Sequence, residues 1–527
     1  MINSKLSQAE FHLSLGRAAS LVARGEWQRA NEIYEALLEL EPDSAELVAE
    51  CSVAALASGQ YSNARVQALR LASLPLRSPE LLLKAARLLR RFEEPESILR
   101  LFHQGSWGAV SGLAALAEFA LLLGSSGLNV QALQVVERML AIEASSPDAF
   151  YLRGLFEMFL GHRDRSLASL ERAVAIEPRM ANAHWLIAMQ GDRGDASAHV
   201  GQMQCVLPHL RPGSEAQAYL LYSLHSRLDS LGRYSEAWGA LQGGAAIMRA
   251  ATAYSRPEQQ NLFDALKKLE LPAYRPPPRA KDEPNLIFIV GMFRSGTTLI
   301  ERVLAGHPDI ADGGETYQLT ASMRDAVNQD GQAVVDREIT DRSSGMDFDQ
   351  VRKRMFAYAK WRSEGRKYLT EKLPSNFLNV GFILHAFPEA RILHLRRDPI
   401  DTCFSNLRTI FRGAAPYACD QSDMADYYVR YTDLMSHWHA QAPGNILDID
   451  YADFIADPEG QARRIMSYCG LEFEPQALKI ERQGGQAATA SAAHVRQGIL
   501  KNRTNAWRPY ADYLQPLLLG LRISANV

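Results

Sequence analysis

The segment Gly-Met-Phe-Arg-Ser-Gly-Thr-Thr at residues 291–298 has the composition of an anion-binding loop. The apolar, β-branched run 285–290 before it predicts a buried strand, and the apolar spacing after it predicts a helix that ends near 306–308. A strand, a glycine loop and a helix start together point several backbone N–H groups at one anion. The segment is therefore a candidate anion site.

One position separates this loop from those that bind nucleoside triphosphates. Gly291, Gly296 and Thr298 follow the spacing of the G-x-x-x-x-G-K-[ST] pattern, but Thr297 stands in the lysine position. Because that lysine contacts the β and γ phosphates, kinase or ATPase chemistry is disfavoured. Arg294 within the loop suggests instead a smaller group with a single bridging oxygen to stabilise. The alternative is a decayed nucleotide loop that is kept only for packing.

A second candidate anion site lies in residues 391–405. Residues 391–395 predict a strand, and Pro399 suits the first turn of a following helix. Arg397 would then lie at the carboxyl end of the strand, where open parallel sheets bind ligands, with Ser405 two turns into the helix. A guanidinium and a hydroxyl there could hold a second phosphate. Taken alone, the Arg-Arg-Asp sequence could form a surface ion pair. Two candidate anion sites at the ends of two predicted strands indicate ligand binding more specifically.

The N-terminal half has an internal period of 34 residues. The residues in phase are Gly25, Gly59, Gly127 and Gly161, then Ala30, Ala64 and Ala132, and finally Pro42 and Pro178. The glycine permits a tight turn between two helices, the alanine lets them approach, and the proline ends the second helix. The pattern resembles the tetratricopeptide repeat, with about six or seven repeats over roughly 10–265 and a degenerate unit at 80–113 that lacks the glycine.

Stacked helix pairs of this kind form an all-α solenoid with a concave face. We expect that face to hold a peptide, a partner protein or a second subunit; the alternative is a scaffold that only packs on the next domain. A proline-rich segment then separates two halves of different character. A chain of 527 residues is too long for a single hydrophobic core. We therefore predict a repeat domain at 1–270, a linker at 271–284 and an α/β domain with a parallel sheet at 285–527.

Composition and charge exclude several classes of protein. Hydrophobic residues make up 47% and charged residues 22%, as in globular chains, and a net charge of −3 gives no general attraction to nucleic acid or anionic lipid. No apolar run is long enough to span a membrane, and no signal-peptide pattern is evident. The five cysteines are widely spaced, which indicates a reducing compartment and no structural zinc site. We expect a cytoplasmic protein without nucleic-acid or membrane partners.

Residues 284–316 and 391–405 together resemble the sulfotransferase superfamily, and within it tyrosylprotein sulfotransferases and bacterial repeat-containing sulfotransferases. The resemblance extends over about 284–510 with the motifs in the same order. It implies a P-loop-like fold and the co-substrate 3′-phosphoadenosine 5′-phosphosulfate, which leaves as 3′-phosphoadenosine 5′-phosphate. The implied donor-binding residues are Arg294, Ser295, Gly296, Thr297 and Thr298 for the 5′-phosphosulfate, Arg397 and Ser405 for the 3′-phosphate, Tyr451 near the nucleotide, and Ser491 in a late segment that closes over the 3′-phosphate.

Two positions depart from the family pattern. Ala506 precedes Trp507, where the family often has an arginine or lysine. The candidates to supply that charge are Lys501, Arg503 and Arg508. The second 3′-phosphate arginine of tyrosylprotein sulfotransferases falls on Thr409, with Arg408 beside it. These departures concern the details of donor binding rather than the class of enzyme.

Two further residues match the family's catalytic positions. Glu315 is the candidate base for the acceptor proton, with the capping of the next helix as the alternative. Lys372, at the end of a third predicted strand, would stabilise the bridging oxygen together with Arg294; the alternative is a surface partner of a carboxylate. Cations around the leaving group make a metal unnecessary, and His437 and His439 are expected to form an isolated pair on a helix surface.

Three functions stay open at this point. The acceptor is a tyrosine of a peptide or protein presented by the repeats, or a carbohydrate or small molecule, or the chain is a repeat scaffold with a vestigial donor site. Tyrosylprotein sulfotransferases carry arginines soon after the catalytic glutamate. Here the residues between Glu315 and Arg324 include no lysine or arginine. Acidic tyrosine motifs are therefore not clearly supported, and the joint presence of loop, base and lysine disfavours a vestigial site.

Overall fold

The computed structural model describes residues 8–76, 78–191, 195–411, 413–480 and 504–522. Contacts divide the chain into two compact units. The first comprises Met1–Ala144, Leu271–Tyr274 and Tyr317–Met355, and the second comprises Ser145–Glu270, Arg275–Thr316 and Phe356–Val527. Each unit therefore combines repeat helices with segments from the C-terminal half.

Four helix pairs make up the repeat part of the first unit, within its described residues. They are α1 (Gln8–Ala23) with α2 (Trp27–Leu40), α3 (Ala45–Ala57) with α4 (Tyr61–Leu71), α5 (Pro79–Arg91) with α6 (Pro95–His103), and α7 (Leu113–Ser125) with α8 (Asn129–Ile142). The predicted small residues lie between paired helices, since Ala30, Ala64 and Ala132 are fully buried. Between α3 and α4 the approach is close enough for Ser52 Oγ to donate to the Ala64 carbonyl at 2.7 Å.

The first unit also contains α17 (Gln318–Ala326), α18 (Arg337–Asp341) and the start of α19 (Phe348–Ser363). Two arginines bind this segment to the repeats. Arg65 contacts Glu94 at 2.6 Å and Asp325 at 3.2 Å, and Arg354 contacts the same carboxylates at 3.2 and 3.4 Å. Because these four side chains are largely buried and mutually paired, the network fixes α4, α6, α17 and α19 against one another.

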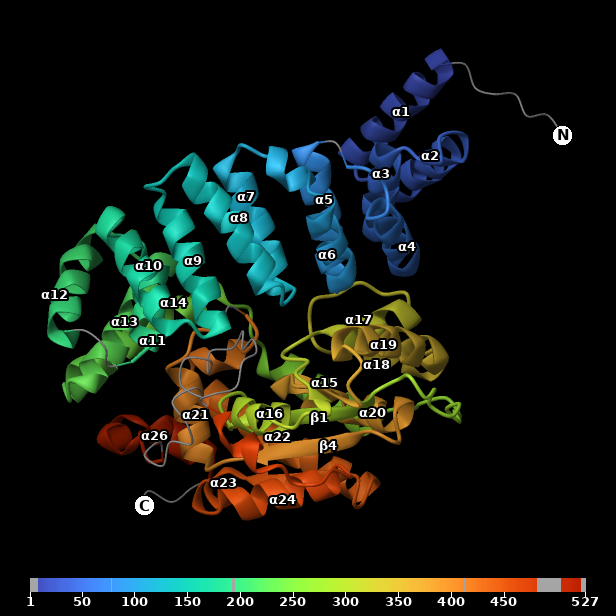
Figure 1. Cartoon of the computed structure of the whole chain (residues 1–527). Helices are drawn as coiled ribbons and strands as arrows, with labels where there is room; N and C mark the ends of the chain where they lie inside the picture. Colours follow the sequence, from blue (N-terminus) through green and yellow to red (C-terminus); the bar gives the residue numbers. More distant parts are fainter. Residues whose placement is uncertain (1–7, 77, 192–194, 412, 481–503, 523–527) are drawn as a thin grey trace. The chain divides into compact units, whose positions relative to one another are not determined.

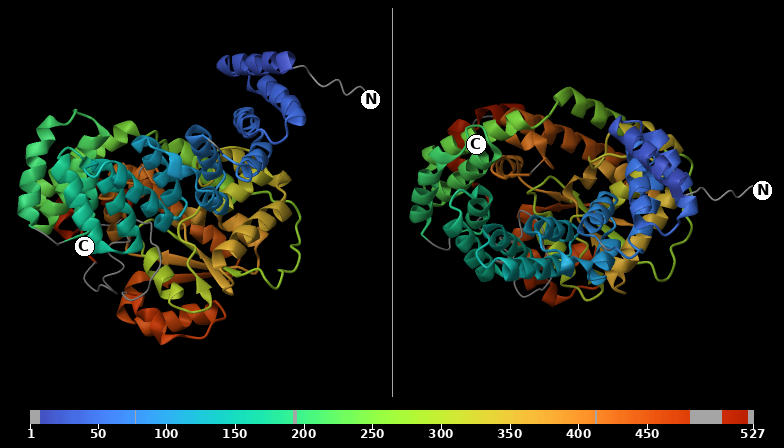
Figure 2. Two further views of the ribbon diagram at one scale, coloured as in Figure 1. Left: turned by 45° about the horizontal axis from the view of Figure 1, so that its top comes forward. Right: turned by 90° about the horizontal axis from the view of Figure 1, so that it is seen from above.

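The second unit begins with further repeat helices. They are α9 (Pro147–Leu160), α10 (Arg163–Ile176), α11 (Ala181–Met189), α12 (Ala196–Val206), α13 (Glu215–Ser230) and α14 (Tyr234–Ala251), followed by α15 (Arg256–Lys267). α9 packs on α10 and α13 on α14, whereas α11 and α12 each pack on α13. Figures 1 and 2 show α9 alongside α10 and α13 alongside α14. The predicted all-α repeat region is thus confirmed. Residues 268–284 then form neither helix nor strand as far as Asn285.

The turns between paired helices are left-handed, as the glycine phase predicts. Gly59 has φ 80° and Gly161 has φ 88°. In the degenerate unit, Glu93 stands 34 residues after Gly59 and adopts φ 55°. A side chain in this region costs roughly 1–2 kcal/mol, so the surrounding helices impose the turn on a residue that disfavours it. The turn between α5 and α6 is therefore kept although Glu93 stands in place of the glycine.

A five-stranded parallel sheet, in the order β2-β3-β1-β4-β5, lies in the second unit. The strands are β1 (Asn285–Gly291), β2 (Ile310–Ala311), β3 (Tyr368–Glu371), β4 (Arg391–Arg396) and β5 (Ile446–Asp450). Ile287 is in register with Arg391 of β4, and Asn285 with Tyr368 of β3. The predicted parallel α/β fold is confirmed. Because all strands run the same way and β1 lies between β3 and β4, their carboxyl ends meet at one edge.

Helices cover both faces of this sheet (Figure 1). On one face, Ile287 and Leu393 pack in a core with α16 (Thr297–Ala305), α23 (Tyr451–Ala456) and α24 (Pro458–Tyr468). On the other, Phe288 contacts Phe387, and His394 contacts Tyr431 of α22 (Gln421–Gln441). The remaining elements are η1 (Ser106–Ala109), η2 (Leu207–His209), η3 (Ser343–Gly345), η4 (Pro374–Asn379), α20 (Val380–Ala386), α21 (Pro399–Leu407), η5 (Pro416–Cys419), η6 (Pro475–Leu478), η8 (Arg508–Tyr513) and α26 (Gln515–Gly520).

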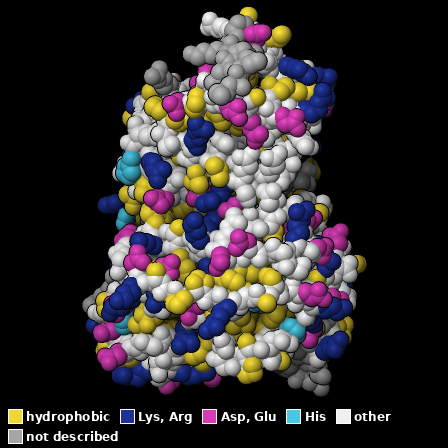
Figure 3. All heavy atoms as spheres, turned by 90° about the vertical axis from the view of Figure 1, so that its right-hand side faces the viewer, with side chains coloured by type: hydrophobic (Ala, Val, Ile, Leu, Met, Phe, Trp, Pro, Cys, Tyr) yellow, Lys and Arg dark blue, Asp and Glu magenta, His cyan; other side chains and the backbone are white. Residues whose placement is uncertain are grey.

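Lys and Arg side chains are interspersed with Asp and Glu over the face drawn in Figure 3. Among the helices in the described part of the chain, none combines the length and apolarity that crossing a bilayer requires. All five cysteines are free.

Candidate active site

The loop after β1 adopts a backbone that its glycines permit. Gly291 has φ 151°, Arg294 φ 68° and Gly296 φ 111°. A Cβ atom at Gly291 would lie 2.7 Å from the Leu395 carbonyl oxygen, and one at Gly296 would lie 2.7 Å from Cδ2 of Tyr451. Both glycines are therefore required by close approach as well as by conformation, and they bring the loop against the ends of β4 and β5.

A buried hydroxyl within this loop fits an oxygen-rich ligand. Ser295 is 1% exposed, and its Oγ has no hydrogen-bond partner among the described residues. Leaving a buried polar atom unpaired costs about 1–3 kcal/mol, which an anion bound at the loop would recover. Thr297 and Thr298, also buried, form the first turn of α16, where backbone N–H groups lack partners within the helix.

The second predicted anion group lies beside this loop. Arg397 Nη1 donates to the carbonyl oxygen of Arg294 at 3.3 Å, and Arg294 Nε donates to Ser405 Oγ at 3.2 Å. The Arg397 guanidinium also lies 4.9 Å from the ring centroid of Tyr451. Arg294, Arg397 and Tyr451, which follow β1, β4 and β5, thus lie together with Ser405 of α21 at one edge of the sheet. The loop and the Arg397 guanidinium therefore do not lie on opposite faces of the sheet, an arrangement that would exclude a shared ligand.

Lys372 follows β3 and lies on the other side of the loop. It is fully buried, with Nζ 2.6 Å from Glu315 Oε1, 3.4 Å from Thr298 Oγ1 and 3.5 Å from Glu301 Oε2. Burial lowers the pKa of the ammonium group, but the carboxylates of Glu315 and Glu301 outweigh it, and the net pKa is raised. A surface pairing of this lysine is excluded by its burial, and it stays charged at neutral pH.

Glu315 reaches Lys372 from a turn that its neighbours fix. The backbone N–H of Lys372 donates to the Gly314 carbonyl at 3.0 Å, and a Cβ at Gly313 would lie 1.9 Å from the Thr370 carbonyl oxygen. The Glu315 side chain is 27% exposed, so one side of the carboxylate faces solvent. Tyr317, not Glu315, occupies the N-cap position of α17. The arrangement leaves a carboxylate accessible to an acceptor and paired with a buried cation.

Two acidic residues at this edge, Glu301 and Asp401, are not among the site residues predicted from the sequence. Glu301, on α16, is 3% exposed and lies 3.5 Å from Lys372 Nζ; its signal was a charge inside an otherwise apolar helix face. Asp401, on α21, lies 3.8 Å from Arg397 Nη2 and accepts the backbone N–H of Asn505 at 2.9 Å. Spacing alone could not pair Glu301 with Lys372 or Asp401 with Asn505, because these partners are distant along the chain.

Several other predicted residues have different surroundings. Thr409 Oγ1 donates to the Ser405 carbonyl, and Arg408 pairs with Asp229 at 3.5 Å, so neither contacts the loop through a described bond. Arg324 is buried and donates to Asp336 at 2.6 Å and to the Ala333 carbonyl, so it is committed within its own unit. Ser491, Lys501 and Arg503 lie outside the described residues.

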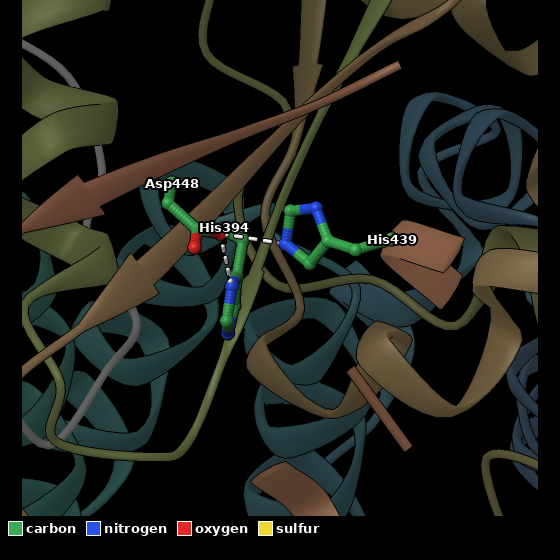
Figure 4. Close-up of side chains that lie close together, drawn as sticks. All are labelled: His394, His439 and Asp448. Atoms are coloured by element: carbon green, nitrogen blue, oxygen red, sulfur yellow. Dashed lines mark hydrogen bonds and ion pairs between the residues drawn. The ribbon is translucent and has the colours of Figure 1, made fainter. Parts of the chain in front are cut away.

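Three potential metal ligands, His394 of β4, His439 of α22 and Asp448 of β5, lie close together (Figure 4). His394 Nδ1 and His439 Nε2 lie 2.7 and 2.8 Å from Asp448 Oδ1, and Arg396 Nη1 lies 3.2 Å from its Oδ2. Burial raises the pKa of Asp448, but the His394 hydrogen bond and charge outweigh it and the net pKa is lowered. The expectation that His439 forms an isolated pair with its neighbour is wrong. Since the carboxylate is already paired and a guanidinium adjoins it, the cluster serves to join β4, β5 and α22.

Comparisons with known proteins indicate which families this chain is similar to. The model described as "Sulfotransferase family" matches residues 284–475. The chain is 27% identical over 374 residues to an uncharacterized protein of Aquifex aeolicus (68% of this chain, 49% of the relative), so it spans about half of that relative. It is 25% identical over 235 residues to a putative protein-tyrosine sulfotransferase of Caenorhabditis briggsae (42% and 80%). It is 30% identical over 118 residues to an omega-hydroxy-beta-dihydromenaquinone-9 sulfotransferase of Mycobacterium tuberculosis (21% and 30%).

The similar solved structures include sulfotransferases and tetratricopeptide-repeat proteins. The sulfotransferase domain from the curacin biosynthetic pathway has a TM-score of 0.30 at 16% identity and covers 46% of this chain and 98% of its own. The tetratricopeptide-repeat protein YrrB has a TM-score of 0.26 at 20% identity and covers 32% and 88%. The resemblance of residues 284–475 to sulfotransferases is thus confirmed by the family match.

Proposed function

We propose that the chain transfers the sulfuryl group of 3′-phosphoadenosine 5′-phosphosulfate to an acceptor hydroxyl. The proposal starts from the match of residues 284–475 to the sulfotransferase family. The observation that carries this proposal is the meeting of two anion-binding groups, the loop around Ser295 and the guanidinium of Arg397, at one edge of the sheet. A nucleotide phosphorylated at both ends of its ribose needs two such groups within reach of each other. Loops for triphosphates, in contrast, need a lysine at the position of Thr297.

The proposed roles divide the site into a donor side and a chemical side. Arg294, Ser295, Gly296, Thr297 and Thr298 hold the 5′-phosphosulfate. Arg397 and Ser405 hold the 3′-phosphate, and Tyr451, whose ring packs on Gly296 and on Arg397, borders the nucleotide; Ser491 stays a prediction from the family resemblance. The bound donor supplies the sulfuryl group and a phosphate leaving group. No metal is part of the proposal, because Lys372 and Arg294 supply positive charge.

On the chemical side, Glu315 takes the proton of the acceptor hydroxyl, and Lys372 with Arg294 stabilises the bridging oxygen. The support is the position of Lys372 Nζ, 2.6 Å from Glu315 Oε1 and 3.4 Å from Thr298 Oγ1. The Lys372 ammonium thereby lies beside both the proposed proton acceptor and the first turn of α16, which follows the donor loop. Glu315→Ala should lower turnover by orders of magnitude while donor binding persists; near-normal turnover would refute the assignment of the base.

A peptide tyrosine held by the repeats is the first acceptor to test, because protein-tyrosine sulfotransferases are among the relatives. The match to a sulfotransferase of a menaquinone derivative favours a small-molecule hydroxyl as the second candidate. Arg324, the first cation after Glu315 in the sequence, is buried and paired with Asp336, so peptides without acidic flanks belong in the test. The repeat helices are also the proposed site of protein binding or dimerisation, and free cysteines support a cytoplasmic location.

Incubation with labelled donor and a panel of acceptors, followed by mass spectrometry for added sulfate, tests the activity. The panel should contain tyrosine peptides, carbohydrates and hydrophobic alcohols. Thermal stabilisation by 3′-phosphoadenosine 5′-phosphate, compared with ATP, tests the donor site separately. Stabilisation by ATP alone, or by neither compound, would contradict the two-phosphate site. A vestigial site would bind the bisphosphate and transfer nothing.

A further inference from the structure

Glu301 is a buried carboxyl that contacts Lys372 and the backbone of the turn that carries Glu315. Its Oε1 accepts the backbone N–H of Gly314 at 3.1 Å and the hydroxyl of Thr370 at 3.4 Å. Its Oε2 lies 3.5 Å from Lys372 Nζ. One carboxyl therefore holds the turn that carries Glu315 through one oxygen and the cation through the other.

A carboxyl with 3% exposure is costly to retain unless its surroundings compensate it. The charged groups that face it are Lys372 after β3, Arg302 on its own helix, Asp312 after β2 and Glu315 in the turn. Burial, followed by Asp312, raises the pKa of Glu301 to about 8, against the opposing effect of Lys372 and Arg302. Near neutral pH the carboxyl is therefore largely protonated, and the Lys372 ammonium is left mainly to Glu315.

We propose that Glu301 is a positioning residue, which keeps the base and the cation in contact by anchoring the Gly313–Glu315 turn and confining the Lys372 side chain. This inference rests on the proposed sulfotransferase function and adds a residue to it. The contacts to Gly314 and Lys372 come from separate oxygens of one side chain, so its loss releases both partners at once. When Glu301 ionises at alkaline pH, a second negative charge beside Lys372 draws the ammonium away from Glu315.

Two variants separate positioning from simple packing. Glu301→Leu fills similar space without a hydrogen-bond acceptor, whereas Glu301→Gln keeps an acceptor oxygen and cannot ionise. We expect Glu301→Leu to lower kcat about 100-fold, because a misplacement of about 1 Å can cost that much. Its KM for the donor and its stabilisation by 3′-phosphoadenosine 5′-phosphate should change less than about 3-fold. Glu301→Gln should recover at least about 10-fold of the lost kcat and should lack the alkaline decline of the wild type.

Glu157 on α9 provides a matched control, because it is also a buried glutamate (7% exposed) and is distant in sequence from the loop, base and lysine. Glu157→Gln and Glu157→Leu should leave kcat and its pH profile unchanged. The proposal is overturned if Glu301→Leu retains kcat within about 3-fold, if kcat and donor affinity fall together, or if the Gln and Leu variants behave alike. A wild type that sulfates no acceptor overturns the proposed function itself, a different outcome from an active wild type with an indifferent Glu301.

Discussion

Replacing Lys372 with methionine removes the buried charge between two carboxyl groups while keeping most of the side-chain volume. Breaking a buried ion pair usually costs about 3–5 kcal/mol, because one charge is left without compensation. Here the cost should be smaller at pH 7, about 1–2 kcal/mol, since one partner is mostly neutral and the other can be hydrated. Glu301 has a pKa of about 8, and the Glu315 side chain is 27% exposed.

The same reasoning makes the cost depend on pH. The folded-state pKa of Glu301 lies above its ordinary value of 4.5, so the stability it contributes is complete below that value and is lost as pH rises toward about 8. Without Lys372 this pKa rises further, so the variant continues to lose stability above pH 8, where the wild type has levelled off. One pKa unit corresponds to about 1 kcal/mol, so the Lys372→Met deficit should grow by about that amount between pH 7 and pH 9.

Chemical denaturation at pH 7 and pH 9 measures both deficits, and product formation with saturating donor measures kcat. We expect kcat to fall about 100- to 1,000-fold, the usual loss for one group that stabilises developing charge, while stabilisation by the bisphosphate product persists. A deficit above about 3 kcal/mol at pH 7 would mean that Glu301 is ionised in the native protein. A deficit that is equal at both pH values would refute the electrostatic argument, and turnover within about 5-fold of the wild type would refute the role of the lysine.

Three further outcomes follow from the same structure. Arg397→Ala should weaken binding of 3′-phosphoadenosine 5′-phosphate at least about 10-fold, measured by calorimetry, with little loss of stability; unchanged affinity would contradict its assignment to the 3′-phosphate. Glu301→Gln should flatten the decline of unfolding free energy between pH 5 and pH 8, because the amide cannot titrate, and a slope equal to that of the wild type would contradict the raised pKa. Gly161→Ala should lower stability by roughly 1–2 kcal/mol in denaturation, since φ is 88° there; a neutral effect would show that the turn relaxes.

The repeat half illustrates what local sequence can determine. The phase of Gly59 and Gly161 located the left-handed turns, because a positive φ is a local requirement that glycine meets without strain. The same phase failed to distinguish Glu93, which adopts the turn without being glycine, because packing of the flanking helices decides that conformation. Periodicity thus predicts the unit, and tertiary contacts decide its exceptions.

In the C-terminal half, the strands and the glycine loop could be predicted from the sequence, since each depends on neighbours along the chain. The parallel strand order decided which of those residues meet. It placed Lys372 beside Glu315 and Thr298, Arg397 beside Arg294, and Tyr451 on Gly296. Only the tertiary structure brought Glu301 into this group, because a charge on an apolar helix face has no meaning until the partners from other strands are in place. Hydrogen bonds and charge pairing act over a few ångströms of space, whatever the separation along the chain.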